Sequence, residues 1–293
     1  MVPGRPATAP CAAGSSFACR YARGAAGRVA PYHPPGWAAV GTALLAFMGA
    51  ASSGVAAEPL QGAAILVYHR FGPTAASTTV SDAALDEQLA WLASHVRVAP
   101  LRSVIESLRV GSIAADRPCV AITADDGHRS VYTDLYPRIL RYRLPVTLFI
   151  YPSAISNASY ALTWPQLTEM AASGFVDVQS HTYWHPNFHQ EKAHRSPADY
   201  RAFVSMQLAR PKSVLEARMG KPVDMLAWPY GIVDDALEAA AASAGYTAAF
   251  TLADRAARPG MDMLALPRFW ISDGDRTARL RTELATACPL HTE

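Results

Sequence analysis

The sequence has few cysteines and lacks several common catalytic signatures. It contains four cysteines in 293 residues and no C-x-x-C pair, which excludes a zinc-finger type of site and a disulfide-rich scaffold. Cys119 and Cys288 fall in the main part of the chain, and we expect that they could pair in an oxidising compartment. No G-x-S-x-G segment occurs, so a serine hydrolase is disfavoured.

Charge is scarce as well. Asp, Glu, Lys and Arg make up 17% of the chain, and the formal net charge is +2. The first 57 residues contain four arginines and no Asp, Glu or Lys, so the remainder is close to neutral and slightly acidic. Nucleic acids and anionic membranes require a concentrated basic surface. We therefore expect no nucleic-acid partner.

No apolar run reaches the roughly 20 residues that a membrane-spanning helix needs. An apolar stretch at residues 37–48 is followed by small residues up to Ala57 and then by Glu58 and Pro59, as in a signal peptide. We predict a leader over residues 1–57, cleavage after Ala57, a secreted or periplasmic location and no stable membrane span after cleavage. A membrane anchor is the alternative. The leader is long before its apolar stretch, which an upstream mis-assigned start codon would explain.

From residue 62 onward, short apolar runs alternate with segments of helical periodicity, a pattern typical of parallel β/α folds. Strands are predicted at residues 63–68, 119–123, 146–151, 175–179, 223–228, 246–252 and 264–271. Helices are predicted at residues 82–95, 101–110, 130–142, 164–172, 197–219 and 234–244. No repeat or linker interrupts the pattern. We predict one α/β domain over residues 58–293, a barrel somewhat smaller than the eight-stranded type.

Three polar clusters follow predicted strands. They are Asp125-Asp126, His181 with His185, and residues 229–231. In parallel α/β folds the carboxyl ends of the strands carry the active site. Two histidines and one carboxylate can hold a cation and leave a coordination position open, as in catalytic sites. The second carboxylate is then free to face substrate.

Each cluster has a simpler interpretation when it is taken alone. Asp-Asp-Gly is common in turns, and His185 could be an exposed loop residue. The order, the spacing and the strand-end positions of the three clusters together favour a functional site.

The segments T-A-D-D-G (123–127), S-H-T-Y-W-H-P (180–186) and A-W-P-Y-G (227–231) resemble the motifs of the polysaccharide deacetylase family, the NodB-homology domain of carbohydrate esterase family 4. Residues 65–71, 162–170, 244–250 and 266–271 also resemble the family. The resemblance covers nearly all of residues 58–293. It implies a distorted (β/α)7-type barrel, a single NodB-homology domain and metal-dependent hydrolysis of N-acetyl or O-acetyl groups on sugars.

The resemblance implies a role for each matching residue. Asp125 resembles the general base, and Asp126, His181 and His185 resemble the metal ligands. Zn²⁺ is the expected metal, although Co²⁺ or Ni²⁺ suits the same donors. Tyr230 matches the position that supplies a backbone N–H to the oxyanion. The expected substrate-binding residues are Pro229, Tyr230 and Trp228, with a core position as the alternative for Trp228.

The chain also departs from the family pattern. Ala227 stands where many members carry an arginine that orients the base. Arg268, in L-P-R-F-W-I, is the candidate replacement, and an exposed strand-end arginine is the alternative. The family's late histidine, which protonates the leaving amine, has no clear counterpart. His69 and His291 are candidates, and we assign neither.

We expect removal of acetyl groups from an N-acetylglucosamine-containing polysaccharide. The Y-H-R-F and A-W-P-Y-G segments favour an exopolysaccharide or biofilm polymer over peptidoglycan or a chitin-like polymer. The alternatives are a catalytically silent carbohydrate-binding relative and an O-acetyl esterase of the xylan type. The presence of Asp125 favours an enzyme, because a binding module has no use for a base.

Overall fold

The computed structural model of the chain describes residues 62–111, 119–285 and 287. The predicted leader with its cleavage site, Cys288 and His291 lie outside these residues. Cys119 is disulfide-bonded. The other three cysteines also lie outside the described residues, so the pairing of Cys119 with Cys288 stays a prediction. Within the described ranges, no helix combines the length and apolarity that a membrane crossing requires.

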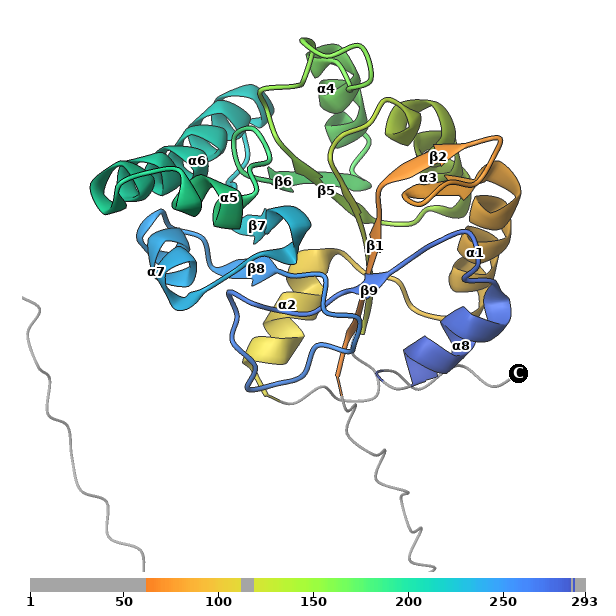
Figure 1. Ribbon diagram of the computed structural model, residues 1–293. Coiled ribbons are helices and arrows are strands. Elements are labelled where there is room, and N and C mark those ends of the chain that lie inside the picture. Colours follow the sequence, from red (N-terminus) through yellow and green to blue (C-terminus); the bar gives the residue numbers. More distant parts are fainter. Residues whose placement is uncertain (1–61, 112–118, 286, 288–293) are drawn as a thin grey trace, which may run out of the picture. The chain divides into compact units, whose positions relative to one another are not determined.

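Seven parallel strands form one curled sheet at the centre of the fold (Figure 1). Their order across the sheet is β8-β7-β6-β5-β4-β1-β9. The strands are β1 (Ala64–Tyr68), β4 (Val120–Asp125), β5 (Val146–Ile150), β6 (Val176–Ser180), β7 (Met225–Ala227), β8 (Ala248–Phe250) and β9 (Phe269–Trp270). Every residue of β1, β4 and β5 is buried, as expected for parallel strands that are covered on both faces. The expected (β/α)7-type barrel is confirmed.

The two edges of the sheet are linked by the segment that leads into β9. Leu266 forms a parallel bridge with Phe250 of β8. The backbone N–H of Leu266 donates to Ala249 (2.9 Å), and that of Thr251 donates to Leu266 (2.8 Å). Three residues later, at Phe269, the chain pairs with β1. Residues 266–270 therefore connect β8 to β1, and this segment carries Arg268.

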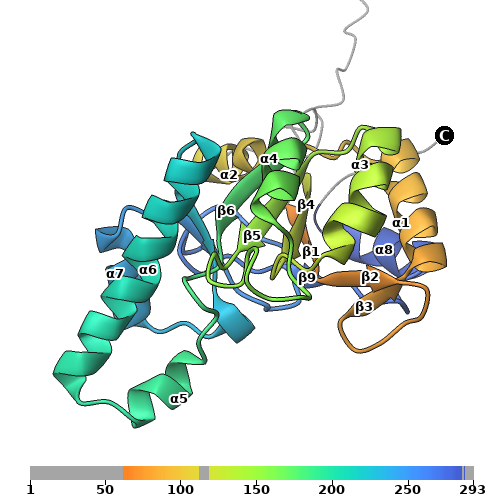
Figure 2. The ribbon, with the colours of Figure 1, turned by 90° about the horizontal axis from the view of Figure 1, so that it is seen from above.

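The helices lie around the outer side of the sheet (Figure 1). They are α1 (Asp82–His95), α2 (Leu101–Arg109), α3 (Tyr136–Tyr142), α4 (Trp164–Ala172), α5 (Phe188–Ala193), α6 (Pro197–Met219), α7 (Asp235–Ser243) and α8 (Thr277–Ala285). A separate pair of short strands is formed by β2 (Arg70–Gly72) and β3 (Thr79–Ser81). Figure 2 shows that α5 and the N-terminal part of α6 project beyond the strands.

Three helices have the bounds that the sequence predicts, because their ends carry clear signals. Ser81 caps α1 by accepting a hydrogen bond from the N–H of Ala84. Thr163 and Gln166 form a capping box at the start of α4. Helix α6 ends at Met219 and is capped by Gly220, whose φ of 64° is typical of a helix C-terminus.

The predicted helix at residues 130–142 is present, but most of its first half is not α-helical. That part is the π-helical turn η1 (Val131–Leu135), in which the N–H of Tyr136 donates to Val131. Pro137 follows at the start of α3 and has no N–H, so the regular α-helical hydrogen bonding cannot continue through it. The elements α5, α8, β2 and β3 were not predicted, since they are short and lie outside the strong apolar periodicities.

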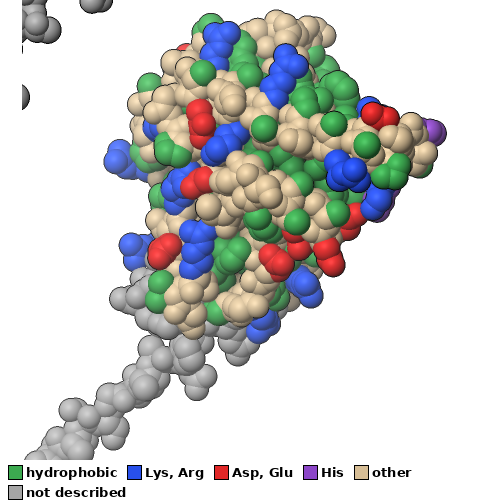
Figure 3. All heavy atoms as spheres, turned by 90° about the vertical axis from the view of Figure 1, so that its left-hand side faces the viewer, with side chains coloured by type: hydrophobic (Ala, Val, Ile, Leu, Met, Phe, Trp, Pro, Cys, Tyr) green, Lys and Arg blue, Asp and Glu red, His purple; other side chains and the backbone are tan. Residues whose placement is uncertain are grey.

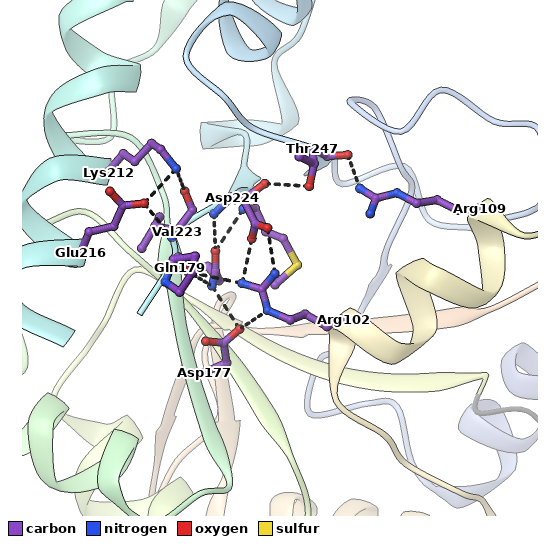
Figure 4. Close-up of polar contacts among 11 residues, drawn as sticks. Arg102, Arg109, Asp177, Gln179, Lys212, Glu216, Val223, Asp224 and Thr247 are labelled. Atoms are coloured by element: carbon purple, nitrogen blue, oxygen red, sulfur yellow. Dashed lines mark hydrogen bonds and ion pairs between the residues drawn. The ribbon is translucent and has the colours of Figure 1, made fainter. Parts of the chain in front are cut away.

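Strand β7 pairs with β6 at a single position, and side chains complete its attachment. The Oε1 atom of Gln179 accepts hydrogen bonds from the N–H groups of Asp224 (3.1 Å) and Met225 (3.0 Å). Arg102 of α2 donates to the carboxylate of Asp224 (2.9 Å) (Figure 4). The two hydrogen bonds to Gln179 satisfy backbone donors where the strand ladder is incomplete.

One face of the molecule is formed by α5, α6 and α7. Hydrophobic side chains are exposed on this face, interspersed with charged side chains (Figure 3). A cavity of about 720 Å³ lies between α6 and α7, and its lining includes Val204, Leu237 and Ala240. None of the predicted site residues lines this cavity, so the candidate site lies elsewhere.

Candidate metal centre

The turn after β4 separates two adjacent carboxylates. Asp125 ends the strand, and Asp126 and Gly127 follow with φ values of 73° and 72°. A Cβ atom on Gly127 would lie 2.8 Å from the side chain of Ile150, so this position requires glycine. Asp is one of the few other residues that adopt a left-handed conformation readily. The sharp turn lets the two carboxylates point in different directions.

The loop after β6 carries the two histidines. The Nδ1 atom of His181 lies 2.8 Å from the carbonyl oxygen of Ala227. A carbonyl only accepts, so Nδ1 donates and Nε2 keeps its lone pair when the ring is neutral. His185 has a φ of 64°, and its N–H donates to the hydroxyl of Thr182 (3.2 Å). The His181 ring is therefore fixed by a contact that leaves Nε2 available, whereas the hydrogen bond of His185 holds its backbone.

Asp126, His181 and His185 form one cluster. Oδ1 of Asp126 lies 3.5 Å from Nε2 of each histidine, and the three potential ligand atoms all lie within 4.8 Å of one another. One carboxylate oxygen and two imidazole nitrogens fit the donor set of a catalytic transition-metal site. The structure thus brings together the three side chains that the sequence predicts as ligands.

Asp125 lies beside this cluster and is held by Arg268. The two guanidinium nitrogens Nη1 and Nη2 donate to Oδ1 (2.8 Å) and Oδ2 (2.7 Å) of Asp125. The Arg268 side chain is fully buried, and it also donates to Thr123 and to the carbonyl of Thr251. Oδ2 of Asp125 lies 4.0 Å from Nε2 of His181. Arg268 is therefore a buried partner of Asp125 and not an exposed strand-end arginine.

Charge and burial set the protonation of these groups. Burial raises the pKa of Asp125, but the charges of Arg268 and His181 outweigh it, so the pKa is lowered. Burial also raises the pKa of Asp126, but the hydrogen bond and the charge of His181 outweigh it, so this pKa is lowered as well. Burial, followed by the charge of His181, lowers the pKa of His185 to about 4. Both carboxylates are therefore ionised at neutral pH, and His185 is neutral.

The structure also places His69 at this site. Tyr68, the last residue of β1, lies opposite Ala124 of β4, so His69 leaves the sheet beside Asp125. Its ring lies 4.3 Å from the ring of Trp270. Burial lowers the pKa of His69, while the charges of Asp125 and Asp126 act in the opposite direction. The sequence offers His69 only as an unassigned candidate, because its position depends on which strands pair.

Only part of the predicted substrate-binding set is exposed. Tyr230 is 58% exposed, has a φ of 58° and lies with its ring 4.6 Å from that of His185. Trp228 is fully buried, and its indole N–H donates to the carbonyl of Leu264 (2.8 Å). Pro229 is also buried. Trp228 therefore takes the core position that was its alternative, and a contact of Pro229 with substrate stays a prediction.

A side chain of α6 supports the loop between His181 and His185. The sequence did not indicate this role. Gln207 is fully buried. Its Oε1 atom accepts hydrogen bonds from the N–H groups of Tyr183 and Trp184, both at 3.1 Å. A single Gln in a long helix carries no sequence signal of this role. Gln207 acts on the loop between His181 and His185 and not on the metal ligands directly.

Backbone strain is concentrated at the same place. Among the described residues, six non-glycine residues have a positive φ. Four of them are Asp126, Thr182, His185 and Tyr230. Such conformations persist where the surrounding contacts enforce them, and they cluster at functional sites.

Residues 112–249 match the family described as polysaccharide deacetylase. The chain is 26% identical over 202 residues to the poly-β-1,6-N-acetyl-D-glucosamine N-deacetylase of Staphylococcus epidermidis. That alignment covers 67% of this chain and 68% of the relative. The corresponding protein of Staphylococcus aureus strain MRSA252 is 24% identical over 200 residues, with the same coverage of both chains.

Two solved structures share the fold. The deacetylase PplD of Streptococcus pyogenes, in complex with acetate, superposes with a TM-score of 0.68 at 21% identity and covers 78% of this chain and 100% of its own. IcaB of Ammonifex degensii superposes with a TM-score of 0.66 at 24% identity and covers 78% of this chain and 98% of its own. The similarity extends over the whole barrel.

Proposed function

The chain belongs to the polysaccharide deacetylase family, and from this premise we propose that it removes N-acetyl groups from a β-1,6-linked N-acetylglucosamine polymer. The curated relatives named above act on that polymer. One observation carries the proposal. The cluster of Asp126, His181 and His185 lies directly beside Asp125, whose two oxygens are held by a buried arginine.

Asp126, His181 and His185 are the residues that would hold a divalent metal ion, for which we propose Zn²⁺, with Co²⁺ and Ni²⁺ as metals that suit the same donors. Such an ion, when bound, polarises the acetyl carbonyl and makes a nearby water more acidic. His181 is suited to this position because its Nδ1 donates to Ala227 (2.8 Å). That contact orients the ring and strengthens Nε2 as a ligand.

Asp125 is the proposed general base. It is ionised at neutral pH, and each carboxylate oxygen has a second lone pair beyond the one that Arg268 uses. It can therefore accept a proton from the attacking water while Arg268 fixes its direction. The proposed donor to the developing oxyanion is the backbone N–H of Tyr230, beside His185.

His69 is the group that we propose for the last proton transfer. Its lowered pKa leaves it neutral at neutral pH, so it can receive from Asp125 the proton that the water has lost. Donation of that proton to the amide nitrogen allows the C–N bond to break and gives acetate and a free amine.

The test is acetate release from β-1,6-linked N-acetylglucosamine oligomers by the metal-loaded protein, with acetylated xylan as the O-acetyl control. We expect acetate from the oligomers. Asp125→Asn is expected to keep the metal and lose activity, whereas His181→Ala is expected to lose both, as measured by metal content and acetate. Equal activity of Asp125→Asn and the wild type would reject the assignment of the base. No acetate from any oligomer would favour the silent binding relative.

We further propose that residues 1–57 are a leader removed after Ala57 and that the enzyme acts outside the cytoplasm. The apolar stretch and the small residues before Glu58 support this proposal. N-terminal sequencing of the protein from its native host would test it. A mature chain that starts at Met1 would contradict it.

A further inference from the structure

An exposed tyrosine is held rigidly beside the metal centre. Tyr160 is 43% exposed and lies in the segment between β5 and α4. Its carbonyl accepts a hydrogen bond from the N–H of Arg129 (2.8 Å), and the N–H of Leu162 donates to Gly127 (2.9 Å). The neighbouring residue Ala161 bridges to His128. Tyr160 is therefore attached on both sides to the turn that carries Asp126.

Two further rings connect Tyr160 to the predicted ligands. The hydroxyl of Tyr160 lies 3.0 Å from that of Tyr151, and the ring of Tyr151 lies 5.5 Å from that of His185. The ring of His128 is stacked on that of Tyr160, with 6.4 Å between centroids and an interplanar angle of 10°. We call Tyr151, Tyr160 and His128 the Tyr160 platform. One side chain, that of Tyr151, separates the exposed ring from the metal centre.

Two arginines lie next to the platform. Arg129 donates to the carbonyl of Ser159 (3.5 Å). Arg70 is exposed on β2, and the next residue, Phe71, is joined to the same turn through Ser130. Two guanidinium groups are therefore carried by segments that adjoin the platform.

A flat, exposed aromatic ring next to a catalytic centre suits the apolar face of a sugar ring, and tyrosine adds a hydroxyl at its edge. An N-acetylglucosamine unit is neutral, so the arginines do not disfavour it. A deacetylated unit carries an ammonium group, which Arg70 and Arg129 repel. The platform thus distinguishes the substrate unit from the product unit.

We propose that the Tyr160 platform binds the polymer unit next to the reacting one, and that Arg70 and Arg129 make this position select an N-acetylated unit over a deacetylated one. The proposal rests on the proposed function. Its consequence is a pattern in the product. A unit whose neighbour at the platform has already been deacetylated reacts slowly, so free amines become spaced along the polymer.

The first experiment measures kcat/KM for acetate release from the metal-loaded protein with defined β-1,6-linked oligomers of increasing length. Tyr160→Ala is expected to reduce the gain in kcat/KM from monomer to pentamer by about fivefold to tenfold, the range of aromatic stacking contacts. Tyr160→Phe keeps the ring and is expected to retain most of the gain. An unchanged length dependence in Tyr160→Ala would overturn the binding role.

The second experiment sequences the partially deacetylated pentamers by mass spectrometry. The wild type is expected to give separated free amines, and the double variant Arg70→Gln/Arg129→Gln is expected to give adjacent ones. The matched control is Arg141→Gln, an exposed arginine of α3 that stacks on Tyr142, and it should keep the wild-type pattern.

Runs of adjacent free amines from the wild type would overturn the selectivity. Failure of the wild type to release any acetate would instead reject the proposed function. The two failures are therefore distinguishable.

Discussion

At the scale of single residues, the contact between Arg268 and Asp125 decides how the site works. Both side chains are buried, at 0% and 2% exposure, and the rings of Phe149 and Phe250 lie 5.5 and 5.9 Å from the guanidinium carbon. A buried ion pair contributes little net stability, but the loss of one partner leaves an uncompensated charge. The pair therefore fixes the orientation and the ionisation of Asp125 more than it stabilises the fold.

Arg268→Met is expected to lower the free energy of unfolding by about 3–5 kcal/mol, because Asp125 is left buried without its partner. Urea unfolding measures this change. The double variant Arg268→Met/Asp125→Asn removes both charges and is expected to recover much of the loss. Equal stability of Arg268→Met and the wild type would show that the pair is not buried as described.

The pKa of His185 gives a pH prediction. In the metal-free folded protein NMR should find His185 titrating near pH 4. The unfolded chain takes up this proton near the ordinary histidine value of 6.5, so between these values the unfolded state binds more protons. The contribution of His185 to stability therefore falls as the pH is lowered from 6.5 towards 4.

The control for this titration is His185→Gln, which has no titrating ring. The difference in unfolding free energy between wild type and variant should change over this pH range and be constant above it. A midpoint for His185 at or above 6.5 would contradict the prediction.

At the scale of elements, α6 controls the loop that carries the histidines. Gln207 accepts from two consecutive backbone N–H groups of that loop. Gln179, the penultimate residue of β6, does the same for the start of β7. In both places a buried amide replaces a missing strand partner. The geometry of the metal centre thus depends on a helix that contributes no ligand.

Gln207→Leu is expected to weaken metal binding by about 10-fold to 100-fold, the range found when groups that orient ligands are removed. The cause is the loss of the acceptor for the N–H groups of Tyr183 and Trp184. Gln207→Glu keeps an accepting oxygen and should bind metal more tightly than Gln207→Leu. Titration with Zn²⁺ and a competing chelator measures both.

Ser205→Ala is the matched control for these variants, since it changes an exposed residue of the same helix. It should bind metal like the wild type. Unchanged affinity in Gln207→Leu would show that the loop holds its shape without α6.

At the scale of the whole molecule, metal binding should couple to folding. A metal that binds the folded state alone stabilises it by about 2.7 kcal/mol when its free concentration is 100 times Kd. We expect the Tm to fall by about 5–10 °C when a chelator removes the metal. His181→Ala should show no such difference. Calorimetric scans with and without chelator measure the effect.

The sequence predicts the fold well where signals are local. Apolar runs and caps give the strands and the bounds of α1, α4 and α6, and family motifs point to the residues that the structure brings together at the metal centre. Local signals do not reveal which strands are neighbours, so the position of His69 beside Asp125 could not be derived. Neither could the burial of Trp228, because a strand end can face the core or the rim.

The closing segment at residues 266–270 has a consequence for the order in which the site is assembled. Asp125 and Arg268 are separated by 143 positions in the chain, and Arg268 directly precedes β9, the last strand among the described residues. Until that strand docks between β8 and β1, the carboxylate of Asp125 has no counter-charge in the barrel interior. Assembly of the proposed base therefore requires the chain through β9, and a molecule truncated before Arg268 has no partner for Asp125.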